Sequence, residues 1–399
     1  MSWETSLTKC IHVTFSEGIR VRLGEVLKLP FERGEAEREG RERLANWDLL
    51  RSISMFAVLV VHAAPFLGIH FNVDVGSILG RVALLCDPVF FTLSGYFAIR
   101  ALRGTLSEYY WRKTTTVLLP LFLCAAVLYP VVSKFDNMSL YGFFDWFLSE
   151  LTPWWFIPTL TGYLVVAPFL YLFFESLNDR NMKALTRISL TLMVCGMVWT
   201  FGVWLFEETG HHTVSSALRV VWKIFPTSII ENSYFIYFCL GYFVRRLSRG
   251  LDRTALAMVT VLGCMSVMLD VVFSHMGALL VDPSFYWIMP VCAVFFWVDR
   301  LKVQSGYIKK IVEALAKRSY SIYLFNFSAI AFAYRFLPYG HWYVPGMTSG
   351  LIVWLVCLLL SYLLSLVAAI IFDSFILRPT QTILDRLVRS RRPQGESCD

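Results

Sequence analysis

The chain has 399 residues, of which 57% are hydrophobic and only 16% are charged. Soluble domains usually carry about 25% charged residues, so this composition excludes an ordinary soluble enzyme and indicates a polytopic membrane protein. The net charge of +7 does not indicate nucleic-acid binding, because the basic residues form short clusters between apolar runs, as topology signals do. The nine cysteines form no C-x-x-C or Cys/His cluster, so we predict neither a metal site nor a disulfide framework.

The first 46 residues are expected to form a charged cytosolic tail. They precede the first apolar run, so no signal peptide is predicted. Interspersed Glu and Arg over residues 31–43 favour a solvated helix with offsetting i,i+4 pairs. The alternative is a helix that docks on the membrane surface or on a partner.

Ten apolar segments follow, each long enough to approach a membrane span. They cover residues 47–69, 79–99, 114–133, 154–174, 186–206, 224–244, 255–273, 283–299, 318–336 and 349–373. The sequence therefore predicts an all-α polytopic membrane protein of about ten transmembrane helices. Residues 47–377 form its single membrane domain and residues 378–399 a basic cytosolic tail.

The distribution of basic residues predicts the orientation. If both termini are cytosolic, the loops on the outer side contain only Lys134, Arg219, Lys223 and Arg335, and the other loop bases lie inside. This asymmetry follows the positive-inside rule. It favours ten spans, both ends in the cytosol, and a multi-pass protein of the cell membrane.

The first apolar run contains two basic side chains that share a helix face. Arg51 and His62 are eleven positions apart, which is about three helical turns. A titratable side chain inside a membrane span is costly and is a functional candidate by default. A packed histidine that only hydrogen-bonds a neighbouring helix is the structural alternative. For Arg51 the alternative is an interfacial base paired with Asp48.

Five sequence blocks resemble the membrane-bound acyltransferase-3 family, which includes O-antigen and other cell-surface O-acetylases. They are Asp48 to Arg51 with His62 eleven residues beyond Arg51, Asp87 to Tyr96, Pro153 to Leu160, Phe235 to Tyr242, and Ser319 to Asn326. The blocks occur in family order across nearly the whole membrane domain.

The chain departs from the family pattern at two places. The family often has an Arg-x-x-Arg pair before the third helix; here Lys113 is the first base and Thr116 stands at the second position. A late histidine of the family pattern is Asn326. Because of both departures, fewer of the family's substrate contacts can be assigned to this chain. Arg51 and His62 themselves match the family pattern.

The resemblance implies transfer of an acyl group, usually acetyl, from cytosolic acyl-CoA to a hydroxyl of an envelope glycan or lipid-linked glycan. Acyl transfer needs a base for the acceptor proton, and a neutral His62 in an apolar site can accept it. Positive charge for the CoA phosphates or the developing oxyanion would come from Arg51, Arg112 and Lys113. Acyl-CoA is thus expected as a substrate, and no bound cofactor is expected.

Other polar or aromatic residues have competing interpretations. Asp87 is a candidate to orient His62, as carboxylates commonly do, although the adjacent Pro88 also suggests a local kink. Ser94 with Gly95 favours close helix packing over an acyl-carrying nucleophile. Trp154 and Trp155 are expected at the membrane interface, with a sugar platform as the alternative. Asp270 is expected as a solvated residue at an outer helix end.

Two other functions compete with the acyltransferase. A transporter or flippase for an acidic or acylated solute would use Arg51, His62, Arg81 and Asp87 as a translocation path. Inverted repeats would favour it, and none is visible in the sequence. A sensor or scaffold with a degenerate site is the third possibility. Acyl-CoA dependence separates the first function from the other two.

Overall fold

The protein is described from a computed structural model. The described residues are 45–71, 75–133, 138–151, 153–224, 233–248, 251–278, 282–303, 306–336 and 347–390. The predicted tail at residues 1–46 lies outside them except for its last two residues, as does the end of the C-terminal tail. Residues 102–109 group apart from the rest, so the packing described below concerns residues 45–101 and 110–390.

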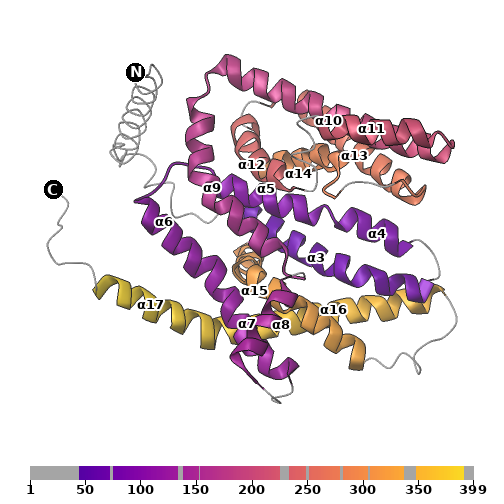
Figure 1. Cartoon of the computed structure of the whole chain (residues 1–399). Helices are drawn as coiled ribbons and strands as arrows, with labels where there is room; N and C mark the ends of the chain where they lie inside the picture. Colours follow the sequence, from indigo (N-terminus) through magenta and orange to yellow (C-terminus); the bar gives the residue numbers. More distant parts are fainter. Residues whose placement is uncertain are drawn as a thin grey trace, which may run out of the picture. The chain divides into compact units, whose positions relative to one another are not determined.

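The described residues form helices and no strand, which confirms the all-α prediction. The longer helices, labelled in Figure 1, are α3 (Ala45–Phe71), α9 (Phe156–Ser176), α10 (Asp179–Glu208), α13 (Arg253–His275), α15 (Gly306–Phe336) and α16 (Met347–Phe372). The shorter ones are α4 (Val75–Ala83), α5 (Cys86–Ala98), α6 (Leu106–Lys113), α7 (Leu119–Val132), α8 (Leu140–Glu150), α11 (His212–Ile224), α12 (Phe235–Leu247), α14 (Ile288–Arg300) and α17 (Arg378–Ser390). Short π-helical segments, η1 (Thr114–Leu118) and η5 (Asp373–Leu377), precede α7 and α17, and a 3₁₀ turn, η4 (Phe285–Trp287), precedes α14.

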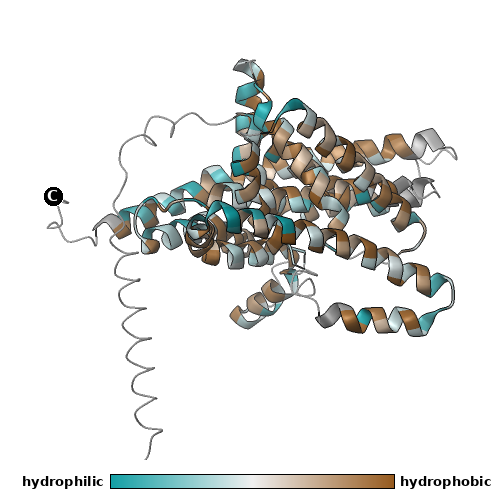
Figure 2. Ribbon diagram, turned by 90° about the horizontal axis from the view of Figure 1, so that it is seen from above, coloured by the Kyte–Doolittle hydropathy of each residue, from teal (hydrophilic) through white to brown (hydrophobic). Residues whose placement is uncertain are grey.

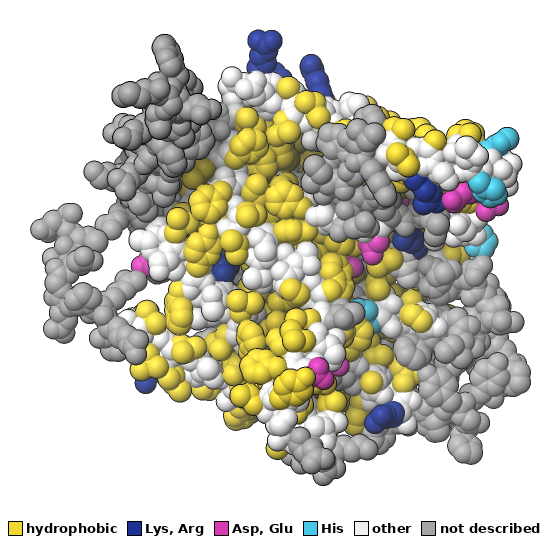
Figure 3. All heavy atoms as spheres, in the orientation of Figure 1, with side chains coloured by type: hydrophobic (Ala, Val, Ile, Leu, Met, Phe, Trp, Pro, Cys, Tyr) yellow, Lys and Arg dark blue, Asp and Glu magenta, His cyan; other side chains and the backbone are white. Residues whose placement is uncertain are grey.

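Seven helical stretches of the described chain are long and apolar enough to cross a membrane. They are Ala45–Pro65, Ile78–Ala98, Leu106–Val132, Phe156–Ser176, Asp179–Glu208, Arg253–His275 and Leu351–Val388. Hydrophobic residues dominate most of these helices (Figure 2), and hydrophobic side chains cover much of the molecular face in Figure 3. These seven stretches match seven of the ten predicted segments.

The helices in the other three predicted segments are not both long and apolar enough to count as membrane spans. Helices α12 and α14 have 13 residues each, or about 20 Å of helix, which is shorter than the ~30 Å hydrocarbon core. Residues 225–232 of the first of these predicted segments lie outside the described residues, and α14 is preceded by the 3₁₀ turn η4. Helix α15 is 31 residues long; its first half carries several charged residues, among them Lys309 and Lys317, and its second half contains the polar residues Asn326 and Arg335.

Helix α3 is the element around which the neighbouring helices pack. It contacts α4, α5, α14, α15 and α16. Figure 1 shows α3 between α4 and α16, and α15, whose first part is seen nearly end-on, packs against both α3 and α16. The buried side chains of this region include Leu59 of α3, Cys124 of α7, Leu324 of α15 and Leu358 of α16. The helix that carries His62 is therefore surrounded on several sides.

Helices α5 and α12 approach each other at two glycines. A Cβ atom on Gly95 would lie 1.8 Å from the carbonyl oxygen of Phe238, and one on Gly241 would lie 2.3 Å from that of Thr92. Any side chain at either position would push the two backbones apart. The close-packing interpretation of the Ser94-Gly95 pair is thus confirmed, because small residues allow such crossings between membrane helices.

Candidate active site

His62 lies in α3, and a residue of α15 contacts its imidazole. Nδ1 of His62 lies 3.2 Å from Oδ1 of Asn326. The ring of Phe327 lies 4.1 Å from the imidazole, centroid to centroid, at an interplanar angle of 31°. The histidine side chain is half-buried and Asn326 is fully buried. The late residue that departs from the family pattern is therefore the hydrogen-bond partner of the candidate base.

Two tryptophans fix the backbone on either side of this pair. Trp354 of α16 donates its Nε1–H to the carbonyl of Ala63 at 2.8 Å. Trp154 donates to the carbonyl of Leu324 at 3.3 Å. Only 3% of the Trp154 residue is exposed, so the expectation that it lies at the membrane interface is wrong. It is a core residue because its indole nitrogen has a buried acceptor.

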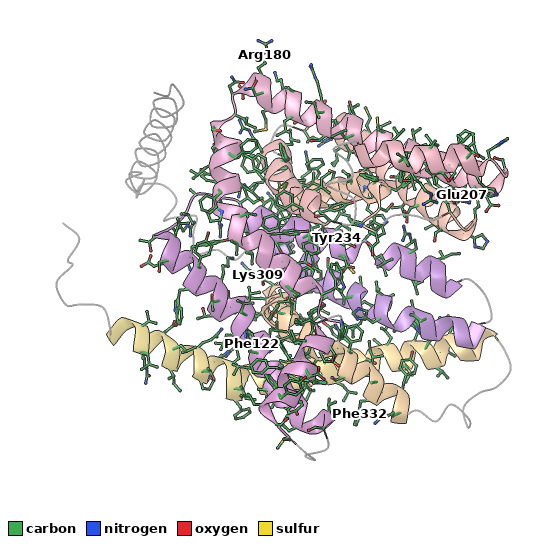
Figure 4. All side chains as sticks on the ribbon, viewed as in Figure 1. Phe122, Arg180, Glu207, Tyr234, Lys309 and Phe332 are labelled. Atoms are coloured by element: carbon green, nitrogen blue, oxygen red, sulfur yellow. The ribbon has the colours of Figure 1, made fainter. Side chains whose placement is uncertain are left out.

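Asp87 opens helix α5 and has a different environment. Its Oδ1 lies 3.5 Å from the thiol of Cys86. The charges of Asp87 and Asp282 are close enough to act on each other, and the phenols of Tyr234 and Tyr323 are also within electrostatic reach. Figure 4 shows Tyr234 among the helices, at the start of α12. Among the described residues, Asn326 and not Asp87 hydrogen-bonds the imidazole of His62.

Helix α15 nevertheless passes beside both His62 and Asp87. Tyr323, which lies within reach of Asp87, is three residues before Asn326, which contacts His62. Residues three apart on a helix share a face and are about 4.5 Å apart along its axis. His62 and Asp87 thus lie beside the same turn of α15, although they do not contact each other.

The predicted donor-binding cations lie near the C-terminal end of α5. The guanidinium of Arg51 lies 5.9 Å from the ring centroid of Phe97. Lys113 lies within electrostatic reach of Arg112 and of Arg100, the second residue beyond α5. Sequence reasoning missed Arg100, whose only signal was its position in a cluster of basic residues that was expected on the cytosolic side. We call Arg51, Arg100, Arg112 and Lys113 the basic group.

Two further observations concern this group. Arg51 also makes the predicted i,i+3 pair with Asp48, at 3.8 Å between Nη1 and Oδ1. Thr116, the second departure from the family pattern, lies in the π-helical segment η1 and donates its hydroxyl to the carbonyl of Arg112 at 2.7 Å. Thr116 therefore supports the backbone beside the basic group and does not add a charge to it.

Asp270 was expected to be solvated, and this expectation is wrong. The residue is 1% exposed and accepts four hydrogen bonds. Arg81 donates from Nε to Oδ2 at 2.7 Å and from Nη2 to Oδ1 at 3.1 Å. Ser284 donates to Oδ1 at 2.7 Å and Trp287 to Oδ2 at 3.2 Å. A helix end is buried here because a segment distant in sequence folds over it.

Within the part of the chain that the structure describes, no group of three or more His, Cys, Asp or Glu side chains could hold a metal ion. At His62 the structure places an imidazole, the amide of Asn326 and the ring of Phe327. An imidazole of this kind can transfer protons, and a basic group three helical turns away can bind an anion.

The fold and this arrangement define a helical membrane protein with a titratable histidine inside an apolar helix. The family model of the acyltransferase domain, of the acyltransferase-3 type, matches residues 44–370. The chain therefore belongs to the acyltransferase-3 family and is a membrane acyltransferase. Neither the curated proteins nor the solved structures contain a match to it.

Proposed function

We propose that the protein transfers an acyl group, acetyl in the first instance, from cytosolic acyl-CoA to a hydroxyl of a cell-envelope glycan or a lipid-linked glycan. The observation that carries this proposal is the placement of His62. It lies within an acyltransferase domain, three helical turns along α3 from Arg51 of the basic group.

In the proposed reaction the acceptor hydroxyl loses its proton to His62 and attacks the thioester carbonyl carbon. A carbon–oxygen bond forms, the carbon–sulfur bond breaks, and the protonated imidazole returns its proton to the departing CoA thiolate. The basic group binds the phosphates of CoA, because cationic side chains are the natural partners of phosphate where no glycine-rich loop is present. Asp87, half-buried beside Tyr234 and Asp282, would face the acceptor rather than the imidazole.

The same proposal includes ten spans, both termini in the cytosol, and residence in the cell membrane. It rests on the distribution of Lys and Arg between loops and on the seven apolar helices. A transporter would need charged side chains that are available along a path. Arg81, one of the four residues assigned to such a path, is instead paired with Asp270 at 2.7 Å.

The test is incorporation of radiolabelled acetyl from acetyl-CoA into envelope material by membranes that contain the protein. His62→Ala should lower incorporation about 10²–10⁴-fold, the usual contribution of a general base. The matched control is His275→Ala, since His275 is exposed at the end of α13 and should leave incorporation unchanged. Equal incorporation by wild type and His62→Ala would remove the assignment of the base. Solute flux without covalent change would favour the transporter.

A further inference from the structure

Arg245 of α12 makes two hydrogen bonds to the C-terminal end of α5. Its Nη1 donates to the carbonyl of Tyr96 at 2.9 Å, and its Nη2 donates to the carbonyl of Ile99 at 2.8 Å. The guanidinium also lies 5.9 Å from the ring centroid of Tyr96. A guanidinium is planar and rigid, so this one side chain fixes both carbonyl groups in one geometry.

The glycine crossing between α5 and α12 brings Arg245 to this place. Gly95 and Gly241 allow the backbones of the two helices to approach closely. Arg245 is four residues after Gly241, and Ile99 is four residues after Gly95. Residues four apart lie on the same face of a helix, so the contact continues one turn further along both helices. The position of Arg245 therefore follows from the close crossing.

The peptide unit that joins Ile99 to Arg100 is held on both sides. Its oxygen, which is the carbonyl oxygen of Ile99, accepts the hydrogen bond from Arg245. Its N–H, which belongs to Arg100, donates to the carbonyl of Ala98 at 3.0 Å. A peptide unit is planar, so these two hydrogen bonds fix its orientation. The side chain of Ile99 is fully buried, whereas Arg100 is exposed. The backbone thus sets the position from which the Arg100 side chain extends.

The end of α5 carries or contacts two members of the basic group. Arg100 lies within electrostatic reach of Lys113, and Arg51 lies 5.9 Å from the ring of Phe97. Like charges repel, so gathering these cations at one place is unfavourable unless an anion binds there. The C-terminal end of a helix carries partial negative charge, which would oppose a bound phosphate. Because it is a cation bonded to two carbonyls at this end, Arg245 offsets that negative charge.

We propose that Arg245 is a positioning residue of the site that binds acyl-CoA, and this proposal rests on the function proposed above. It holds the peptide between Ile99 and Arg100 so that the guanidinium of Arg100 meets a phosphate of CoA. Both terminal nitrogens of Arg245 are engaged with backbone carbonyls, so it acts through Arg100 rather than on the donor itself.

The test is the Kd for CoA, measured by equilibrium binding to the purified full chain in detergent, together with the KM for acetyl-CoA and kcat of acetyl transfer. Arg100→Gln should raise Kd about 10–100-fold, the usual contribution of a charged hydrogen bond. Arg245→Lys keeps the positive charge but lacks the planar fork, and it should raise Kd and KM about tenfold with kcat unchanged. A defect of the fold alone would lower kcat or the yield of folded protein instead.

The double variant Arg100→Gln with Arg245→Lys separates the possible roles of Arg245. If Arg245 acts through Arg100, the double variant should bind CoA no more weakly than Arg100→Gln alone. Additive losses would mean that Arg245 binds the donor itself or disturbs the whole fold, and they would overturn the positioning role. Arg246→Lys is the matched control, because Arg246 is exposed and pairs with Asp179, and it should change neither Kd nor KM.

The same measurements separate this proposal from the proposed function. Unchanged Kd and KM in Arg245→Lys, with acetyl transfer by wild type intact, would overturn the role of Arg245 and leave the function standing. The expected pattern of Kd values without acetyl transfer would remove the proposed function and support the role of Arg245. Arg245→Gln keeps an N–H donor without the charge. It serves where Arg245→Lys does not accumulate, and it should raise Kd at least as much.

Discussion

Asp270 and His62 are both polar side chains inside otherwise apolar helices, yet their surroundings differ. Both oxygens of Asp270 accept two hydrogen bonds each, from Arg81, Ser284 and Trp287. The His62–Asn326 pair shares one hydrogen bond, and the amide nitrogen of Asn326 has no hydrogen-bond partner among the described residues.

This difference distinguishes buried polar residues that stabilise the fold from buried polar residues that can bind a substrate. A cluster in which every donor and acceptor is already hydrogen-bonded offers no group to a substrate, and its removal should destabilise the fold. A cluster that keeps a donor or acceptor without a hydrogen-bond partner stabilises the fold little, and that group can still bind a substrate. Asp270 therefore belongs to the scaffold, where it ties α4 to α13 and to the turn before α14.

The largest expected effect is that of Asp270→Ala. It leaves the guanidinium of Arg81 buried without its partner, and removing one member of a buried ion pair typically costs about 3–5 kcal/mol. The measurement is the free energy of unfolding, obtained by titrating the protein in mixed micelles with SDS. A loss below about 1 kcal/mol would contradict the scaffold assignment.

The matched control is the double variant Arg81→Leu with Asp270→Leu. Replacing both members of a buried pair by apolar side chains is often neutral or stabilising. We therefore expect the double variant to recover most of the stability that the single variant loses.

Ser284→Ala is expected to have an intermediate effect. It removes one of the four hydrogen bonds to Asp270, and a bond to a charged group contributes about 1.5–3 kcal/mol. The same titration measures it. Ser321→Ala offers a comparison, because that hydroxyl also donates to a buried carboxylate, Asp373, at 2.5 Å. An unchanged stability in Ser284→Ala would show that the three remaining bonds suffice.

The smallest expected effect on stability is that of Asn326→Leu. It removes one hydrogen bond worth about 0.5–1.5 kcal/mol but also removes a buried unsatisfied donor, so the two changes offset each other. Stability should stay within about 1 kcal/mol of wild type although activity is lost. The exposed pair of Arg219 and Glu207 gives a reference for a small effect, since Glu207→Gln should lower the free energy of unfolding by about 0.2–1 kcal/mol. A loss above 3 kcal/mol in Asn326→Leu would place the His62 cluster in the scaffold.

The sequence predicted the helices and the isolated histidine well, because both are local signals. An apolar run of sufficient length specifies a helix, and a titratable residue inside it stands out. Helices α12 and α14 have 13 residues each, and both lie within longer apolar runs of the sequence that were predicted to be spans. Periodicity alone does not give the length of a helix within such a run.

The partners of the polar residues were beyond sequence reasoning. Arg81 and Asp270 are 189 residues apart, and nothing near Asp270 indicated that a segment folds over it. Asn326 was noticed only as a departure from a family pattern, 264 residues from the histidine it contacts. The burial of Trp154 likewise depends on an acceptor 170 residues away. Such pairings are set by tertiary packing, which no local pattern encodes.

The attachment of α15 near Asn326 fixes the rotation of that helix. Tyr320 donates to the carbonyl of Val117 in η1 at 2.6 Å, and Ser321 donates to Asp373 in η5 at 2.5 Å. Each residue of an α-helix is turned by about 100° from the one before it. One residue inserted between Ser321 and Asn326 would keep both attachments but turn the amide away from α3. The number of residues between these anchors thus determines which side chain faces the imidazole.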